Sequence, residues 1–234
     1  MKNKFYLFEI LTFIFTIGMI SWNTPELDVF ELQKDNTGLN TLIQTKTKSL
    51  IYHKVKDYGI WKKAFDDFLP QREKNGELSY EVGVLEDDPN TVYVFNTWKS
   101  KDHYKKFKED QELKEKMNDA GVTEPPTFLL LNKLEGSTMV DDKITGIIYH
   151  EVEDYDKWKR AFDDFERTRK EFKEVSYEVG TINGDLKMVY VMNQWDNLQD
   201  YQVFVADAKL KEAMTNAGVI GKPIFLVFNP KEKG

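Results

Sequence analysis

The stretch YHKVKDYGIWKKAFDDF at residues 52–68 decides the fold, because it returns as YHEVEDYDKWKRAFDDF at residues 149–165. The offset between the copies is 150 − 53 = 97 residues, and it holds without a gap as far as Asn132 and Asn229. Internal similarity at a fixed period indicates a repeated structural unit. The chain of 234 residues therefore contains two repeats, each of the size of one small domain.

Each repeat shows the same order of strand and helix signals. In the first copy a β-branched and aromatic run at residues 50–55 predicts a strand, and aromatic residues at 58, 61, 65 and 68 share one face of a predicted helix. Residues 78–85 and 91–98 predict a hairpin, residues 100–120 a broken helical region, and residues 126–132 a last strand. The order β-α-β-β-α-β is the ferredoxin-like, split βαβ plan of the α+β class.

A sheet of this plan is covered by helices on one face, so its other face needs a partner. We expect residues 48–135 to form the first repeat, residues 136–144 a linker and residues 145–231 the second repeat. The two sheets would then face each other and close a barrel within one chain, with the helices outside. Such a protein is predicted to be a monomer that acts as a pseudo-dimer.

The N-terminus has the pattern of a secretory signal peptide or an uncleaved membrane anchor. Residues 1–4 are basic, and residues 5–22 are apolar apart from Glu9. A buried core helix is the alternative. The pattern predicts export, either to the cell envelope (periplasmic or membrane-anchored) or as a secreted protein, with membrane contact through residues 1–22 alone. The polar residues 23–47 are predicted to be a flexible tether.

Composition excludes several classes of function. Forty acidic and 33 basic residues give a net charge of −7, which argues against a nucleic-acid partner. The sequence has no cysteine, which excludes disulfides, thiolate metal sites and a thiol nucleophile.

Four motifs occur in both copies: H-x-V-x-D-Y-x-x-W-K-x-A-F-D-D, S-Y-E-V-G, V-Y-V-x-N-x-W and L-K-E-x-M. They resemble the dimeric α+β barrel superfamily, and within it the antibiotic biosynthesis monooxygenase-like proteins, some of which are labelled cyclases. The resemblance covers nearly all of residues 49–134 and 146–230. In that superfamily two single-domain chains usually pair to form the barrel, so the resemblance implies a tandem fusion.

The resemblance also bears on cofactors. Haem-degrading members of the superfamily use a histidine on the second helix as the iron ligand, and the matching positions here hold Met117 and Met214. Haem is therefore not expected, and neither is any other cofactor or metal. The activity that the resemblance implies stays open, because the superfamily includes oxygenases, isomerases and proteins without a known reaction.

His53, His150, Asn96 and Asn193 are the candidate catalytic residues. Histidine exchanges protons near neutral pH, so His53 or His150 could act as a general base inside the barrel. Asn96 and Asn193, near the end of a strand, could hold a developing oxyanion. The alternatives are core histidines that are hydrogen-bonded to a neighbour, and asparagines that cap the next helix.

The candidate ligand-binding residues are tyrosines and glutamates of the predicted strands. The glutamates lie opposite the aliphatic face of their strand and so are predicted to point into the barrel; the alternative is a wet glutamate at its mouth, or one bridged to a lysine. The set comprises Tyr52, Tyr149, Glu81, Glu178, Tyr93 and Tyr190.

Three functions are compatible with these residues. The protein could bind a small apolar or aromatic molecule without reaction. It could be a cofactor-independent monooxygenase that acts on a phenol or an activated C–H acid. It could also be a structural envelope protein whose barrel is filled with side chains.

Overall fold

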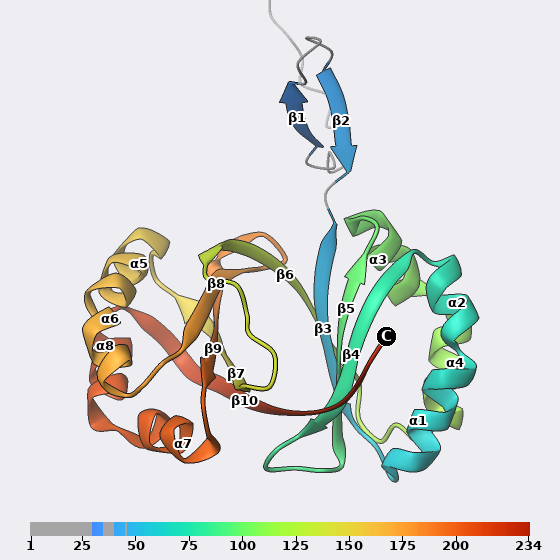
Figure 1. The fold of residues 1–234 in the computed structure, drawn as a ribbon. Coiled ribbons are helices and arrows are strands. Elements are labelled where there is room, and N and C mark those ends of the chain that lie inside the picture. Colours follow the sequence, from blue (N-terminus) through green and yellow to red (C-terminus); the bar gives the residue numbers. More distant parts are fainter. Residues whose placement is uncertain (1–29, 35–39, 45) are drawn as a thin grey trace, which may run out of the picture.

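The computed structural model describes residues 30–34, 40–44 and 46–234 (Figure 1). The predicted leader at residues 1–22 lies outside them. Strands β1 (Phe30–Lys34) and β2 (Asn40–Gln44) pair with each other within the segment predicted to be a tether. Among the described residues no helix is long and apolar enough to span a membrane.

Each repeat forms four helices and four long strands in the predicted order. The first comprises β3 (Thr47–Lys54), α1 (Tyr58–Asp67), α2 (Leu69–Lys74), β4 (Glu77–Leu85), β5 (Thr91–Trp98), α3 (Lys101–Glu109), α4 (Gln111–Asp119) and β6 (Thr127–Gly136). The second comprises β7 (Ile144–Val152), α5 (Tyr155–Asp164), α6 (Glu166–Glu171), β8 (Ser176–Ile182), β9 (Asp185–Trp195), α7 (Leu198–Ala206), α8 (Ala208–Asn216) and β10 (Val219–Lys233).

Polar residues cap the N-termini of the helices that follow the strands. The Asp57 carboxylate accepts the backbone N–H of Ile60 at 2.8 Å, and Asp154 makes the same bond in the second repeat. Ser100 and Asn197 cap α3 and α7. These bonds satisfy N–H groups that have no partner within the helix.

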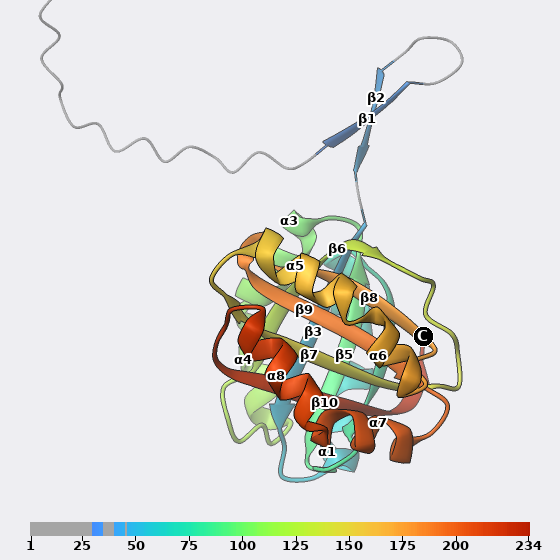
Figure 2. The same cartoon turned by 90° about the vertical axis from the view of Figure 1, so that its left-hand side faces the viewer.

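The eight long strands close one barrel, in the order β10-β4-β5-β3-β6-β8-β9-β7. The last strand of each repeat pairs with a strand of its own repeat and with one of the other, β6 with β3 and β8 and β10 with β7 and β4. Helices α1–α4 lie outside one sheet and α5–α8 outside the other (Figures 1 and 2). The prediction of an α+β pseudo-dimeric barrel within one chain is confirmed.

Glycine allows the close approach at both junctions between the sheets. A Cβ atom on Gly83 would lie 2.3 Å from the carbonyl oxygen of Asn229, and one on Gly180 would lie 2.2 Å from that of Asn132. Contacts this short are repulsive, so both positions exclude a side chain. The glycine of the S-Y-E-V-G motif is thus a requirement of barrel closure.

Side chains of the strands divide between two environments. One core fills the barrel interior with residues of both halves, Tyr93 and Leu50 beside Tyr190 and Ile147 among them. Separate clusters lie between each sheet and its helices. Because successive residues of a strand point to opposite faces, neighbours in sequence belong to different sites.

Candidate functional site

Each half of the protein contains a small cavity between its sheet and its helices. The first cavity, about 60 Å³, is bounded by Ile51 and Val94 of the sheet, Trp61 of α1, and Leu113 and Met117 of α4. The second cavity, about 50 Å³, repeats this lining 97 residues later. Both are mainly apolar, so the few polar groups at their walls set what they can bind.

A buried histidine lines each cavity. His53 is 5% exposed and His150 is 4% exposed, and each ring meets the edge of a tryptophan, with ring centroids 5.8 Å apart for Trp61 and 5.9 Å apart for Trp158. Within the described part of the chain, neither nitrogen of either imidazole has a hydrogen-bond partner. Burial lowers the pKa of both histidines to about 4, so both are neutral at pH 7.

The position of the histidines corrects the prediction that they lie inside the barrel. Tyr52 points inward, so its neighbour His53 points to the helices, as alternation along a strand requires. The alternative of a hydrogen-bonded core histidine also differs from the structure, because the imidazoles are buried without such bonds among the described residues.

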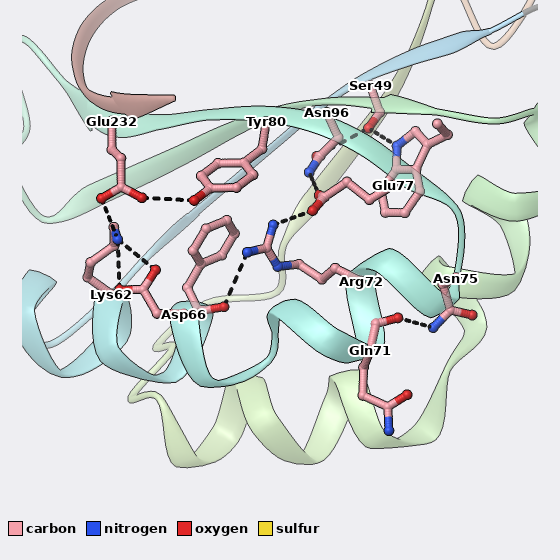
Figure 3. Close-up of polar contacts among 12 residues, drawn as sticks. Ser49, Lys62, Asp66, Gln71, Arg72, Asn75, Glu77, Tyr80, Asn96 and Glu232 are labelled. Atoms are coloured by element: carbon pink, nitrogen blue, oxygen red, sulfur yellow. Dashed lines mark hydrogen bonds and ion pairs between the residues drawn. The ribbon is translucent and has the colours of Figure 1, made fainter. Parts of the chain in front are cut away.

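Asn96 belongs to a buried polar cluster on the first cavity (Figure 3). Its Nδ2 donates to the Glu77 carboxylate, which also accepts from the Arg72 guanidinium. The guanidinium lies over the Phe65 ring, 3.6 Å from the ring centroid, and its charge is thus enclosed by the carboxylate and an aromatic face. Burial raises the pKa of Glu77, and the Arg72 charge opposes that rise.

The second half builds the same cluster from Arg169, Glu174 and Asn193. Arg169 Nε donates to both carboxylate oxygens of Glu174, at 3.2 and 3.1 Å, and Asn193 Nδ2 donates to Oε1. The Glu174 side chain is fully buried. Neither asparagine caps a helix, so that alternative is wrong.

One position differs between the clusters. In the first half Ser49 Oγ accepts a hydrogen bond from Trp98 Nε1 at 2.9 Å and donates one to Asn96 Oδ1 at 3.4 Å. The equivalent of Ser49 is Gly146, which has no hydroxyl.

The second half is therefore short of one polar group. In the described part of the structure, Asn193 Oδ1 and Trp195 Nε1 are buried without a hydrogen-bond partner.

The remaining candidates lie inside the barrel. The hydroxyls of Tyr52 and Tyr149 are 2.6 Å apart and join the two halves. Tyr93 donates to Glu81 at 2.9 Å, and the equivalent pair, Tyr190 and Glu178, is 2.8 Å apart.

Both glutamates also meet a lysine, as the alternative interpretation predicted. Lys233 Nζ lies 3.4 Å from Glu81, and Lys133 Nζ lies 3.3 Å from Glu178. The predicted inward orientation of the glutamates agrees with the structure.

A third and much larger cavity, the central cavity, occupies one end of the barrel. Its volume is about 660 Å³, and it is lined by Glu81, Glu178, Phe95, Met192 and Phe228, among others. The linker crosses its wall, where the Gln194 amide accepts the N–H of Val140 at 2.7 Å and donates to its carbonyl at 2.8 Å. The structure thus places His53 and His150 apart from Glu81 and Glu178, whereas Asn96 lines both the first cavity and the central cavity.

The buried ion pairs of Arg72 with Glu77 and of Arg169 with Glu174 were not predicted from the sequence. Residues 70–76 read as the closing turn of a helix, where charge is ordinary. The available signal was the repeat itself, because arginine and glutamate recur at the same two positions 97 residues later.

Comparison of structures places the fold. An "anthrone oxidase-like protein" superposes with a TM-score of 0.61 at 14% identity, over 81% of this chain and 92% of its own. A "Putative monooxygenase" from Fusobacterium nucleatum superposes with a TM-score of 0.55 at 11% identity, over 82% and 95%. The chain has the dimeric α+β barrel fold.

A third structure extends that fold group. A "Putative Chlorite dismutase" superposes with a TM-score of 0.54 at 10% identity, over 80% of this chain and 96% of its own. Neither a protein-family model nor a curated protein sequence matches the chain. The resemblance seen in the repeated motifs is thus confirmed for the fold.

Proposed function

We propose that the barrel binds a small apolar or aromatic molecule in its two sheet–helix cavities and oxygenates it without a cofactor, with His53 and His150 as general bases. One observation carries the proposal: four imidazole nitrogens line two apolar cavities with no hydrogen-bond partner in the described chain. A buried polar atom without a partner costs about 1–3 kcal/mol. The same cost is present in both halves, and a bound hydroxyl or carbonyl would remove it.

The size of the cavities indicates how a ligand would enter. An engineered cavity of about 150 Å³ holds benzene, so cavities of about 60 and 50 Å³ hold only a functional group. Helices α4 and α8 cover them with one buried residue each, Leu113 and Leu210. The half-buried Met117 and Met214 also line the cavities, and flexible thioethers readily give way to a ring.

The proposed chemistry uses the neutral imidazole as a base. His53 takes a proton from an activated CH₂ group, and the carbanion transfers its electrons to O₂ as a C–O bond forms. The resulting hydroperoxide loses its second C–H proton as its O–O bond breaks, which leaves a carbonyl and releases water. One O₂ is thus consumed per CH₂ converted to C=O, and no cofactor is needed.

The asparagines would support the anion. Asn96 Nδ2 spends one of its two hydrogens on Glu77, and the second is the donor that the proposal assigns to the developing oxyanion. Arg72 supports this arrangement, because its bond to Glu77 fixes the carboxylate that orients the amide.

The test is oxygen uptake by the full chain under air with anthrone, which carries an activated CH₂ group. Uptake with a matching amount of carbonyl product is expected for the wild type, and loss of both is expected for His53→Ala/His150→Ala. The control is Tyr52→Phe/Tyr149→Phe, which removes a barrel hydrogen bond and leaves both small cavities unchanged. Unchanged turnover in the histidine variant would refute the assignment.

A second candidate function rests on the central cavity. Its volume of about 660 Å³ is within the usual range of small-molecule sites, about 300–1,000 Å³. A non-catalytic carrier would hold its ligand there. Binding that survives the histidine variant but is lost in Glu81→Gln/Glu178→Gln would favour the carrier.

The proposal includes export, which the apolar residues 1–22 support. Fractionation of the producing cell would test it, and a cytoplasmic protein would refute it.

A further inference from the structure

The two cavities differ in the hydrogen-bonding state of their asparagine. In the first, Asn96 Oδ1 accepts from Ser49 Oγ, so its acceptor is occupied by the protein itself. In the second, Gly146 replaces that serine, and within the described residues Asn193 Oδ1 has no donor. Asn193 is 1% exposed and lines the second cavity, so a group bound there is placed to supply the missing donor.

The space beside Gly146, where the first half has a serine side chain, is filled by a group that cannot donate a hydrogen bond to Asn193 Oδ1. The Tyr201 ring fills it, because a Cβ atom on Gly146 would lie 2.7 Å from Tyr201 Cε2. The ring centroids of Trp195 and Tyr201 are 5.0 Å apart, against 6.2 Å for Trp98 and Tyr104 in the first half. An aromatic carbon fills the volume of the serine but donates no hydrogen bond to Asn193.

A second difference between the two cavities also concerns their hydrogen-bond donors. Lys116 lines the first cavity, and its equivalent in the second is Ala213. The first cavity also has a free donor, since Arg72 Nε lacks a partner in the described structure, whereas Arg169 Nε is bound to Glu174. Beyond the imidazole that both cavities share, the first cavity therefore has additional donors, and the second has an additional unsatisfied acceptor.

We propose that the two cavities are specialised, and that the second selects a ligand that donates a hydrogen bond, namely a hydroxyaromatic molecule whose O–H binds Asn193 Oδ1. Residue 146 determines this selectivity, because a serine there would occupy the acceptor as Ser49 does. This inference rests on the proposed function, since it assigns a ligand class to one of the two proposed sites. A hydroxyaromatic ligand then binds more tightly in the second cavity, which offers Asn193 Oδ1 in addition to the imidazole acceptor that both cavities have.

The experiment is ¹⁹F NMR titration of the full chain with 4-fluorophenol and with 4-fluoroanisole, which has the same ring but no donor. We expect 4-fluorophenol to have one tight site per chain, which binds it at least about tenfold more tightly than 4-fluoroanisole, as expected for a satisfied buried acceptor, and a weaker site in the first cavity. Ala213→Phe, which fills the second cavity from α8, should remove the tight site.

The decisive variant is one that should gain binding, because a misfolded protein would lose binding instead. Ser49→Ala frees Asn96 Oδ1 while it keeps the Cβ atom, and the number of tight sites for 4-fluorophenol should rise from one to two per chain. Ser79→Ala, at a serine without a contact to either small cavity, is the matched control and should leave the number of tight sites at one.

The outcomes separate this inference from the proposed function. Two equal sites in the wild type, equal affinity for both probes, or a single tight site in Ser49→Ala would overturn the specialisation and leave the proposed function standing. Binding of neither probe would overturn both.

Discussion

Lowering the pH from 7.5 to 5 should destabilise the barrel by about 4 kcal/mol through His53 and His150. Burial lowers the pKa of each from 6.5 to about 4 in the folded chain. Between these two pKa values, the imidazoles of the unfolded chain bind protons and those of the folded chain do not. The stabilising contribution is complete above pH 6.5, is lost as the pH falls toward 4, and changes no further below 4.

The magnitude follows from these two values. At pH 5 an unfolded imidazole is almost fully protonated and a folded one is about nine-tenths neutral, which corresponds to about 2 kcal/mol per histidine. Two histidines give about 4 kcal/mol, a large share of the 5–15 kcal/mol typical of a domain.

The buried carboxylates change the pH dependence of stability in the direction opposite to that of the histidines. Burial raises the pKa of Glu77 and Glu174, so the folded chain takes up their protons more readily and gains stability as the pH falls. A wild-type titration alone would mix the two effects. The difference between the wild type and His53→Leu/His150→Leu cancels the carboxylates and isolates the imidazoles.

The assay is urea unfolding followed by tryptophan fluorescence at pH 7.5, 6.5 and 5. The free energy of unfolding of the wild type should fall by about 4 kcal/mol more than that of the double variant between the first and last pH. Single variants should each remove about half of this difference. Parallel pH dependence in the wild type and the double variant would refute the picture of buried, neutral histidines.

Three further predictions concern the fold. Arg72→Met should lower the free energy of unfolding by about 3–5 kcal/mol, because it leaves the Glu77 carboxylate buried without its partner. Adding Glu77→Gln should recover part of that loss in urea titrations. An unchanged stability of the single variant would contradict the buried pair. Gly83→Ala and Gly180→Ala should each lower the free energy of unfolding by about 1–3 kcal/mol, because they overpack a sheet junction. Gly59→Ala in α1 should be neutral or stabilising. Equal urea midpoints for all three variants would exclude the junction argument. Light scattering should give the mass of one chain, and an obligate dimer would exclude closure of the barrel within the chain.

Much of the fold follows from the repeat and from residue periodicity. The aromatic spacing in residues 58–68 and the alternation in residues 78–85 give the helix and the strand, and the need to cover two open sheet faces gives the barrel. The pairing of β6 with β8 and of β10 with β4, which joins the two sheets, was not predictable, because it depends on backbone approach at Gly83 and Gly180.

The site was less accessible to sequence reasoning. Period-two alternation shows that Tyr52 and His53 face opposite ways, but it does not say which of them faces the helices. That choice depends on tertiary packing, here of Trp61 against the His53 ring. The free acceptor of Asn193 depends on a serine that the other half has and this half lacks, and such a difference acquires meaning only when both clusters are seen.

A fused barrel can diverge in ways that a symmetric dimer cannot. In a dimer of identical chains each substitution occurs twice, so an acceptor freed in one cavity is freed in both. Here the halves differ at the cavity, with Ser49 against Gly146, and at the linker, where Gln194 holds Val140 and its equivalent is Thr97. The second difference serves a linker that only a fused chain possesses. The first makes room for the Tyr201 ring but leaves two buried groups in the described chain unpaired. The ligand proposed for the second cavity would supply the bond that Asn193 Oδ1 lacks, and a symmetric dimer could not confine that bond to one of its cavities.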